Sequence, residues 1–172
     1  MGWLDRKDML LWINKVLEYE NDAQIVLHGI SMGGATVLMT SGEEMPDNVK
    51  AIVSDCAYTS AQDIFASELK LRFGLPAFPI LNSGNVVAQI RAGYSIKEAS
   101  ALNQIKKSNI PTLFIHGSVD NFVPVGMVHE LYSAETSEKD LLIIEGAGHA
   151  ESRDLDPDQY YKKTFNFIEN YI

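Results

Sequence analysis

A serine flanked by glycines is the most chemically suggestive feature of the sequence. Residues 29–34 read GISMGG and contain the pattern Gly-x-Ser-x-Gly. Between a strand and a helix, this pattern forms a sharp turn that projects the serine hydroxyl from the end of the strand. The pattern predicts that Ser31 is a nucleophile. The alternative is a glycine-rich tight turn without chemistry.

A serine hydroxyl needs a base to remove its proton. Among the four histidines, His149 is the predicted base because it lies in a glycine-rich loop directly after the last predicted strand. Open parallel sheets place their sites in such loops. The alternative for His149 is a solvated loop histidine. We expect mainly structural roles for the other three: His28, His116 and His129.

The base needs an acid to orient it, and Asp120 follows the third predicted strand. It should therefore reach the same sheet edge as the serine and the histidine. The chain order serine, aspartate, histidine matches a known triad arrangement. Asp55, at the end of the second predicted strand, is the rival acid. The remaining alternative is that Asp120 only caps the helix that begins near Val125.

Short segments rich in Val, Ile and Leu alternate with amphipathic or apolar helical segments. The predicted strands span residues 24–29, 49–54, 111–116 and 140–144. The predicted helices around them span residues 5–19, 33–39, 124–134 and 157–172. Strands with so little polar alternation are typical of parallel sheets covered by helices. The pattern predicts an α/β domain with a mostly parallel sheet of about four strands.

The segment between residues 57 and 110 is too long for a simple crossover. It contains a predicted helix at 60–73, bends at Pro76 and Pro79, a weaker helix at 86–90, and a helix start at Ser95 with Glu98 three residues on. We interpret 57–110 as a crossover with a small helical cap, inserted within a single domain that spans residues 1–172.

Composition excludes several classes of function. The net charge of −9 disfavours a nucleic-acid partner, and the single cysteine, Cys56, excludes a disulfide framework and a cysteine-based zinc site. No apolar run approaches the roughly 18–20 residues that span a bilayer, and the first residues do not show the basic-then-apolar pattern expected of a signal peptide. We predict a cytoplasmic chain without metal or cofactor, leaving open an export or anchor segment outside it.

The sequence resembles the α/β-hydrolase family, in particular its bacterial cell-surface hydrolase or serine-aminopeptidase-like branch. The resemblance spans essentially the whole chain. Its motifs are GWLDR (2–6), LHGISMGG (27–34), DCAYTS (55–60), FIHG (114–117) with Asp120, Val123 and Pro124, and GAGH (146–149). It implies a triad of Ser31, Asp120 and His149, acyl transfer to water, and no metal. It also implies that the backbone N–H of Met32 is an oxyanion donor.

The sequence departs from this family at its front, because family members have further strands and helices before the helix at 5–19. The second oxyanion donor normally comes from an early loop that the sequence does not contain, so we expect weak activity unless another group substitutes. The strand at 24–29 would also lack its usual neighbour. An uncovered strand edge pairs readily with another chain, which predicts a homodimer or a larger homo-oligomer.

The leading hypothesis is a serine hydrolase that cleaves small carboxylic esters with short or medium acyl chains. Apolar residues of the cap are candidates for an acyl pocket, although they equally suit packing of the cap, and substrate-binding residues stay unassigned. A peptidase or thioesterase with the same triad is one alternative. Another is a catalytically impaired hydrolase fragment that acts as a self-associating binding or structural module.

Overall fold

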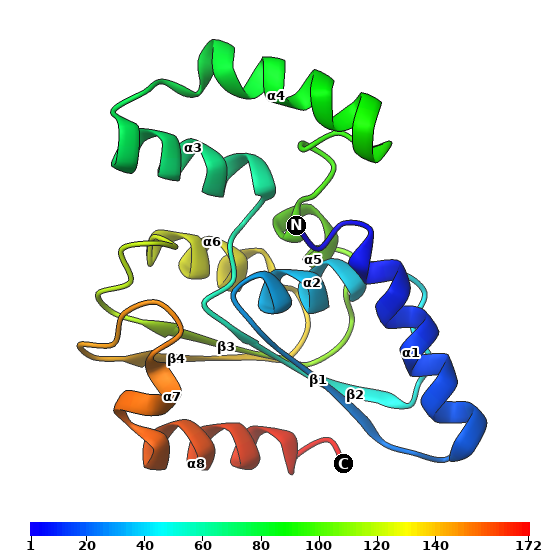
Figure 1. Cartoon of the computed structure of the whole chain (residues 1–172). Coiled ribbons are helices and arrows are strands. Elements are labelled where there is room, and N and C mark those ends of the chain that lie inside the picture. Colours follow the sequence, from blue (N-terminus) through cyan, green and yellow to red (C-terminus); the bar gives the residue numbers. More distant parts are fainter.

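A single sheet of four parallel strands, in the order β1-β2-β3-β4, forms the centre of the protein (Figure 1). The computed structural model describes all 172 residues. The strands are β1 (Ile25–Ile30), β2 (Val49–Asp55), β3 (Thr112–Gly117) and β4 (Lys139–Ile144). The predicted α/β class and the four predicted strands are confirmed. Because all strands run in the same direction, their carboxyl ends meet at one edge of the sheet.

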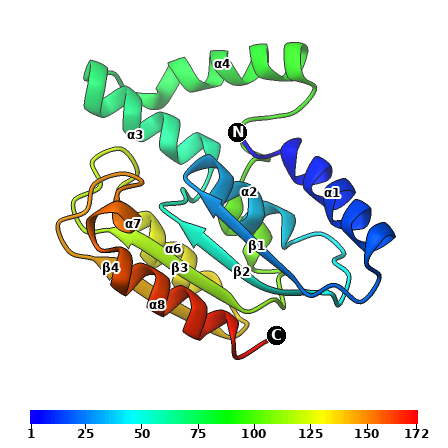
Figure 2. The ribbon, with the colours of Figure 1, turned by 60° about the horizontal axis from the view of Figure 1, so that its bottom comes forward.

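Helices cover both faces of the sheet (Figures 1 and 2). They are α1 (Asp5–Tyr19), α2 (Met32–Thr40), α3 (Ala61–Phe73), α4 (Ala77–Ala92), α5 (Ala101–Ile105), α6 (Gly126–Ala134), α7 (Ser152–Leu155) and α8 (Pro157–Ile168). The helices α2, α5 and α6 lie on one face and α8 lies on the other. No helix is both long enough and apolar enough to cross a bilayer.

Alternating strand residues build a separate core on each face, as the period of two in a strand requires. Ile52 and Phe114 pack into the larger core with α1, α2, α5 and α6. Val53, Leu113 and Ile115 point the other way, against α8. The strands are therefore apolar on both sides, which explains why they read as continuous apolar runs in the sequence.

The helices α3 and α4 form a hairpin that stands away from the sheet in both ribbon views (Figures 1 and 2). Ser60 caps α3 by accepting a hydrogen bond from the Asp63 N–H at 3.0 Å, and α3 ends at Gly74 in the left-handed conformation. The helix α4 buries none of its residues. The boundaries of a cap within residues 57–110 and of a single domain over the chain stay predictions.

Two details of the predicted cap differ in the structure, one in length and one in kind. The weak helix expected at 86–90 is part of the longer α4, which runs from Ala77 to Ala92. Ser95 starts only a turn, although its N–H donates to Glu98 Oε2 at 3.1 Å as in a capping box. The chain extends again at Ser100 to form an antiparallel bridge with Ser60, and Ser100 caps α5 instead. This long-range bridge has no signal in the local sequence.

The strand β1 occupies one edge of the sheet. The predicted homodimer or larger assembly through this strand stays a prediction, which light scattering tests. The helix predicted at 157–172 ends at Ile168, and its start is as predicted: Asp156 accepts a hydrogen bond from the Gln159 N–H at 3.0 Å. The short α7 before it was not predicted.

Candidate active site

Ser31 lies in the sharp turn between β1 and α2, with φ 55° and ψ −116°. Such a backbone is costly for a residue with a side chain and persists only where neighbours fix it. Its N–H donates to the Asp55 carbonyl at 2.8 Å, which ties the turn to the end of β2. A Cβ on Gly29 would lie 2.2 Å from the Gly33 carbonyl oxygen, and one on Gly34 would lie 2.8 Å from the Asp55 oxygen. The turn therefore closes only with glycine at both positions.

The structure brings Ser31, His149 and Asp120 together at the carboxyl edge of the sheet. Ser31 Oγ lies 2.8 Å from His149 Nε2, and His149 Nδ1 lies 2.8 Å from Asp120 Oδ2. His149 belongs to the loop after β4, and Asp120 belongs to the loop after β3. The side chain of Asp120 is fully buried, whereas that of His149 is 22% exposed. The histidine can therefore hydrogen-bond the hydroxyl and the carboxylate at the same time.

Asp120 is held by more than the histidine. Its Oδ1 accepts the N–H groups of Phe122 at 2.9 Å and Val123 at 2.8 Å. Burial alone would raise the pKa of Asp120, but hydrogen bonds from His116, His149 and these two N–H groups hold it far below its ordinary value. The lowered pKa therefore favours the ionised carboxylate. It does not cap α6, which begins at Gly126 with Val125 as its N-cap residue.

His116 and Phe122 are two further residues of the site that the sequence did not mark. His116 is completely buried, and its Nε2 lies 2.9 Å from the Val123 carbonyl oxygen and 3.4 Å from Asp120 Oδ2. The Phe122 ring lies 4.8 Å from the His149 ring, centre to centre. Both contacts arise from the way the loop that contains Asp120 folds. In the sequence, the only indication of them is that this loop directly follows a predicted strand.

Asp55, the rival acid, lies close by but makes no hydrogen bond to His149. It is 1% exposed, and burial raises its pKa to about 6, while a hydrogen bond from the Tyr160 hydroxyl and the neighbouring His116 partly oppose this rise. The Tyr160 hydroxyl also lies 3.0 Å from His28 Nε2. Asp55 is thus part of a second cluster of polar side chains, which includes Tyr160 and His28. The carboxylate that contacts His149 is that of Asp120.

Met32 is the first residue of α2, so its N–H has no partner within the helix. It directly follows Ser31, where a developing negative charge on a substrate oxygen would lie. The positive end of the α2 dipole points to the same place. The position fits the predicted oxyanion donor.

One group of atoms is close enough together to hold a metal ion. A donor atom each from Cys56, Asp120 and His149 lies within 4.8 Å of the others. Burial and the nearby charge of Asp55 raise the pKa of the Cys56 thiol to about 12. The thiolate that would bind a metal is therefore disfavoured, and Asp120 and His149 already hydrogen-bond each other.

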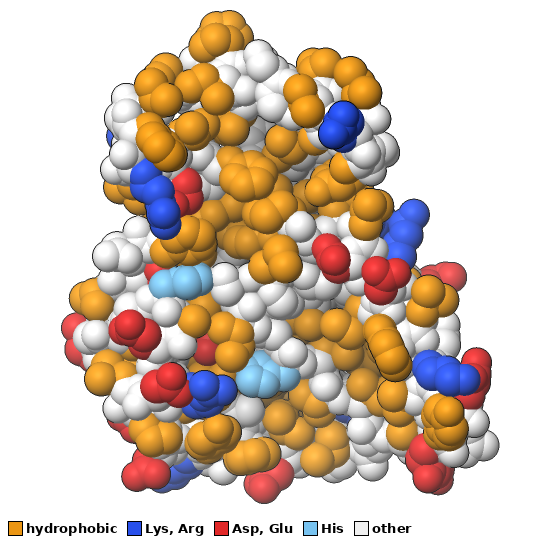
Figure 3. Space-filling model, in the orientation of Figure 1, with side chains coloured by type: hydrophobic (Ala, Val, Ile, Leu, Met, Phe, Trp, Pro, Cys, Tyr) orange, Lys and Arg blue, Asp and Glu red, His pale blue; other side chains and the backbone are white.

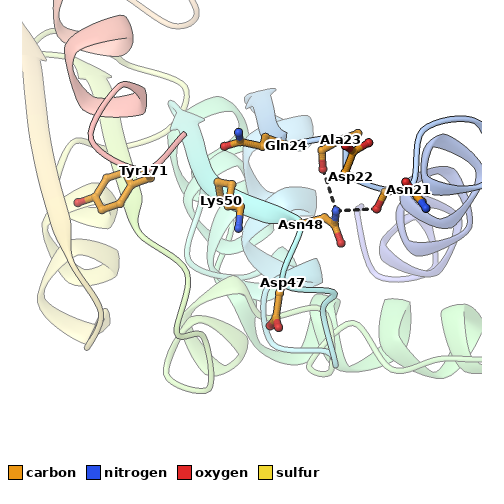
Figure 4. A pocket seen from close by; sticks show the side chains of 8 residues that line it. All are labelled: Asn21, Asp22, Ala23, Gln24, Asp47, Asn48, Lys50 and Tyr171. Atoms are coloured by element: carbon orange, nitrogen blue, oxygen red, sulfur yellow. Dashed lines mark hydrogen bonds between the residues drawn. The ribbon is translucent and has the colours of Figure 1, made fainter.

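The surface has two hollows that differ in their position and in the residues that line them. A polar hollow of about 540 Å³ lies at the amino ends of β1 and β2, where Asn48 donates to the carbonyls of Asn21 and Ala23 (Figure 4). This is the sheet edge opposite to Ser31. An apolar hollow of about 370 Å³ lies between α3 and α4 and is lined mainly by Phe65, Leu69, Phe73, Ile80, Leu81 and Ile96. Only the second is part of the predicted cap.

A model of the prolyl oligopeptidase family matches residues 4–172. The chain belongs to this family. Its curated relatives include the uncharacterized protein YqkD of Bacillus subtilis, 29% identical over 170 residues, with 98% of this chain and 56% of YqkD covered. The uncharacterized protein YfhR of Escherichia coli K12 is 28% identical over 151 residues, with 86% and 46% covered. The chain thus spans about half the length of these relatives.

Solved structures show the same fold. The acylaminoacyl peptidase of Pyrococcus horikoshii has a TM-score of 0.73 at 23% identity, with 98% of this chain and 28% of that chain covered. The Pyrococcus furiosus esterase PF2001 has a TM-score of 0.73 at 18% identity, with 99% and 63% covered. The α/β-hydrolase fold inferred from the motifs is confirmed. The solved neighbours thus include a peptidase and an esterase.

Proposed function

We propose that this chain is a serine hydrolase that cleaves carboxylic esters through an acyl-enzyme, with Ser31 as nucleophile. The contact of Ser31 Oγ with His149 Nε2 at 2.8 Å carries the proposal, because His149 is itself held by Asp120. A serine is activated when its hydroxyl contacts an imidazole that in turn contacts a buried carboxylate. The three side chains have this arrangement.

In the first half of the reaction, the Ser31 oxygen attacks the acyl carbon while His149 Nε2 accepts the hydroxyl proton. The carbonyl oxygen gains negative charge and accepts a hydrogen bond from the Met32 N–H. When the bond to the alcohol oxygen breaks, His149 returns the proton to that oxygen. In the second half, water attacks the acyl-Ser31 ester, His149 again accepts the proton, and the acid leaves with Ser31 restored.

Asp120 has an electrostatic task in both halves. Its low pKa keeps it negative, so it stabilises the imidazolium that forms when His149 takes a proton. The same carboxylate accepts the Nδ1 proton and so leaves Nε2 free to face Ser31. The two backbone N–H groups on its other oxygen fix its orientation.

The second candidate is a peptidase that uses the same residues. Membership of the prolyl oligopeptidase family favours it. The two functions differ in the leaving group, because an amine leaves less readily than an alcohol and needs the His149 proton earlier. A comparison of p-nitrophenyl butyrate with aminoacyl p-nitroanilides separates them: the ester proposal expects the higher kcat/KM for the ester and little turnover of the anilides.

The direct test is hydrolysis of p-nitrophenyl butyrate by the Ser31→Ala variant. We expect at least a thousandfold loss of kcat/KM with an unchanged circular dichroism spectrum. Ser133→Ala is the matched control, because this exposed serine hydrogen-bonds only to the backbone of its own helix. Equal activity of the wild type and the Ser31→Ala variant would contradict the proposal. An inactive but folded wild type would favour the impaired-fragment alternative.

A further inference from the structure

The outer part of the hairpin differs in charge from the rest of the chain. From Leu69 to Lys97 the sequence has no acidic residue and four basic ones. These are Lys70, Arg72, Arg91 and Lys97. The rest of the chain carries 10 basic and all 23 acidic residues. Arg72 pairs with Glu68, and none of the other three takes part in a salt bridge. This segment is therefore a positively charged region on a strongly acidic protein.

The same segment exposes an unusual amount of apolar surface. Its exposed large apolar side chains are Leu71, Phe73, Leu75, Phe78, Ile80, Val86, Val87 and Ile90. Phe78 is 72% exposed and Ile90 is 77% exposed. Figure 3 shows apolar side chains spread over the hairpin at the top of the molecule, with few acidic groups among them. Large exposed apolar patches mark interaction surfaces.

The helix α1 also exposes apolar side chains, and it provides an internal comparison. Leu11, Trp12 and Tyr19 are each more than 60% exposed. However, α1 contains as many acidic as basic residues, and Glu20 and Asp22 follow it directly. An anionic surface would repel this end of the molecule. Of the two exposed apolar faces, only the one on the hairpin combines apolar side chains with an excess of positive charge.

We propose that residues 69–97 dock this protein onto an anionic lipid bilayer. Apolar side chains such as Phe78 and Ile90 enter the headgroup region, and Lys70, Arg91 and Lys97 face the lipid phosphates. This pairing of apolar and basic side chains is how peripheral segments bind membranes. The charge of the hairpin favours an anionic bilayer over pairing of two hairpins from two copies, because the two hairpins would carry the same positive charge.

One residue of the hairpin lies close to the candidate active site. The guanidinium of Arg72, near the end of α3, lies 5.5 Å from the centre of the Phe122 ring. That ring contacts His149. In Figure 3 the hairpin and the body meet at a recess lined by apolar side chains, with a histidine side chain below it. The docking proposal goes beyond the ester chemistry, and binding is measured without any turnover.

Co-sedimentation with vesicles tests the proposal. We expect the wild type to bind vesicles of equal parts phosphatidylglycerol and phosphatidylcholine, and to bind pure phosphatidylcholine vesicles at least tenfold more weakly. Raising the salt concentration from 0.05 to 0.5 M, which screens surface charges, should weaken binding to the anionic vesicles. Equal binding to both lipids, or none to either, would overturn the proposal.

Two double variants locate the surface. Phe78→Ser with Ile90→Ser should weaken binding to anionic vesicles at least tenfold, and Lys70→Glu with Arg91→Glu should do the same. The matched control is Leu11→Ser with Trp12→Ser, which removes equally exposed apolar side chains from α1. An equal loss in the control would overturn the assignment to the hairpin. Loss of a concentration-dependent oligomer in the Phe78 and Ile90 variant, without vesicle binding by the wild type, would assign the surface to a second copy instead.

Discussion

The carboxyl edge of the sheet and the α3–α4 hairpin are built under opposite constraints. At the sheet edge, even one added carbon on Gly29 or Gly34 would collide with backbone. In the hairpin, a Cβ on Gly84 would meet nothing within 4 Å, and α4 buries none of its residues. The turn that holds Ser31 is thus closely confined by its neighbours. The hairpin is defined by the composition of its surface, so the two regions should respond differently to the same kinds of substitution.

The largest effect is expected from Asp120→Asn. The Asn side chain can still accept the N–H groups of Phe122 and Val123, but its own NH₂ would face His149. The imidazole would then carry its proton on Nε2 and could not accept the proton of Ser31. We expect kcat/KM for p-nitrophenyl butyrate to fall about 10⁴-fold, with little change in the thermal midpoint. Asp154→Asn, at an exposed aspartate, is the control. A loss of less than tenfold would contradict the role of Asp120.

Gly29→Ala should strongly destabilise the protein. The new methyl group would lie 2.2 Å from the Gly33 carbonyl oxygen, so β1 or α2 would have to move. We expect the free energy of unfolding to fall by about 3 kcal/mol or more, measured by urea denaturation. A variant as stable as the wild type would show that the turn is less constrained than its geometry indicates.

The raised pKa of Asp55 predicts a dependence of stability on pH. The folded state holds this proton up to about pH 6, whereas the unfolded chain releases it near 3.8. Asp55 therefore reduces stability as the pH rises from about 4 to 7. Asp55→Asn cannot lose a proton, so its stability relative to the wild type should rise across this window by about 2–3 kcal/mol.

Urea denaturation of both proteins at pH 4, 5.5 and 7 measures this difference directly. The lowered pKa of Asp120 contributes stability that falls only as the pH drops toward 4 and below, and this contribution is common to both proteins, so it cancels in their difference. A constant difference between variant and wild type over this range would show that Asp55 titrates normally.

The smallest effect is expected from Gly84→Ala, the hairpin counterpart of Gly29→Ala. The methyl group enters open space within α4, and alanine loses less backbone entropy than glycine on forming a helix. We expect a gain of up to about 1 kcal/mol in the free energy of unfolding and unchanged kcat/KM. A destabilised Gly84→Ala variant would mean that α4 packs more tightly than its exposure shows.

The sequence predicted the sheet and the meeting of Ser31, Asp120 and His149 because both follow from local patterns. Apolar runs mark the strands, and parallel strands bring the loops after them to one edge. Contacts that depend on how loops and distant segments fold together had no such pattern in the sequence. The bridge between Ser60 and Ser100 joins segments far apart in the sequence. His116 lies only four residues before Asp120, but its contact depends on how the loop between them folds. The exposed α4 lacks the buried apolar face that reveals a helix, so its length was underestimated.

The central claim is that Ser31 is an activated nucleophile, and labelling with a fluorophosphonate tests it most directly. This probe reacts covalently with a serine whose proton is removed by a neighbouring base. We predict that intact-mass and peptide mass spectrometry will find one phosphonyl group per chain, on Ser31, and none in the folded Ser31→Ala variant. An unlabelled but folded wild type, or a label on another residue, would contradict the account.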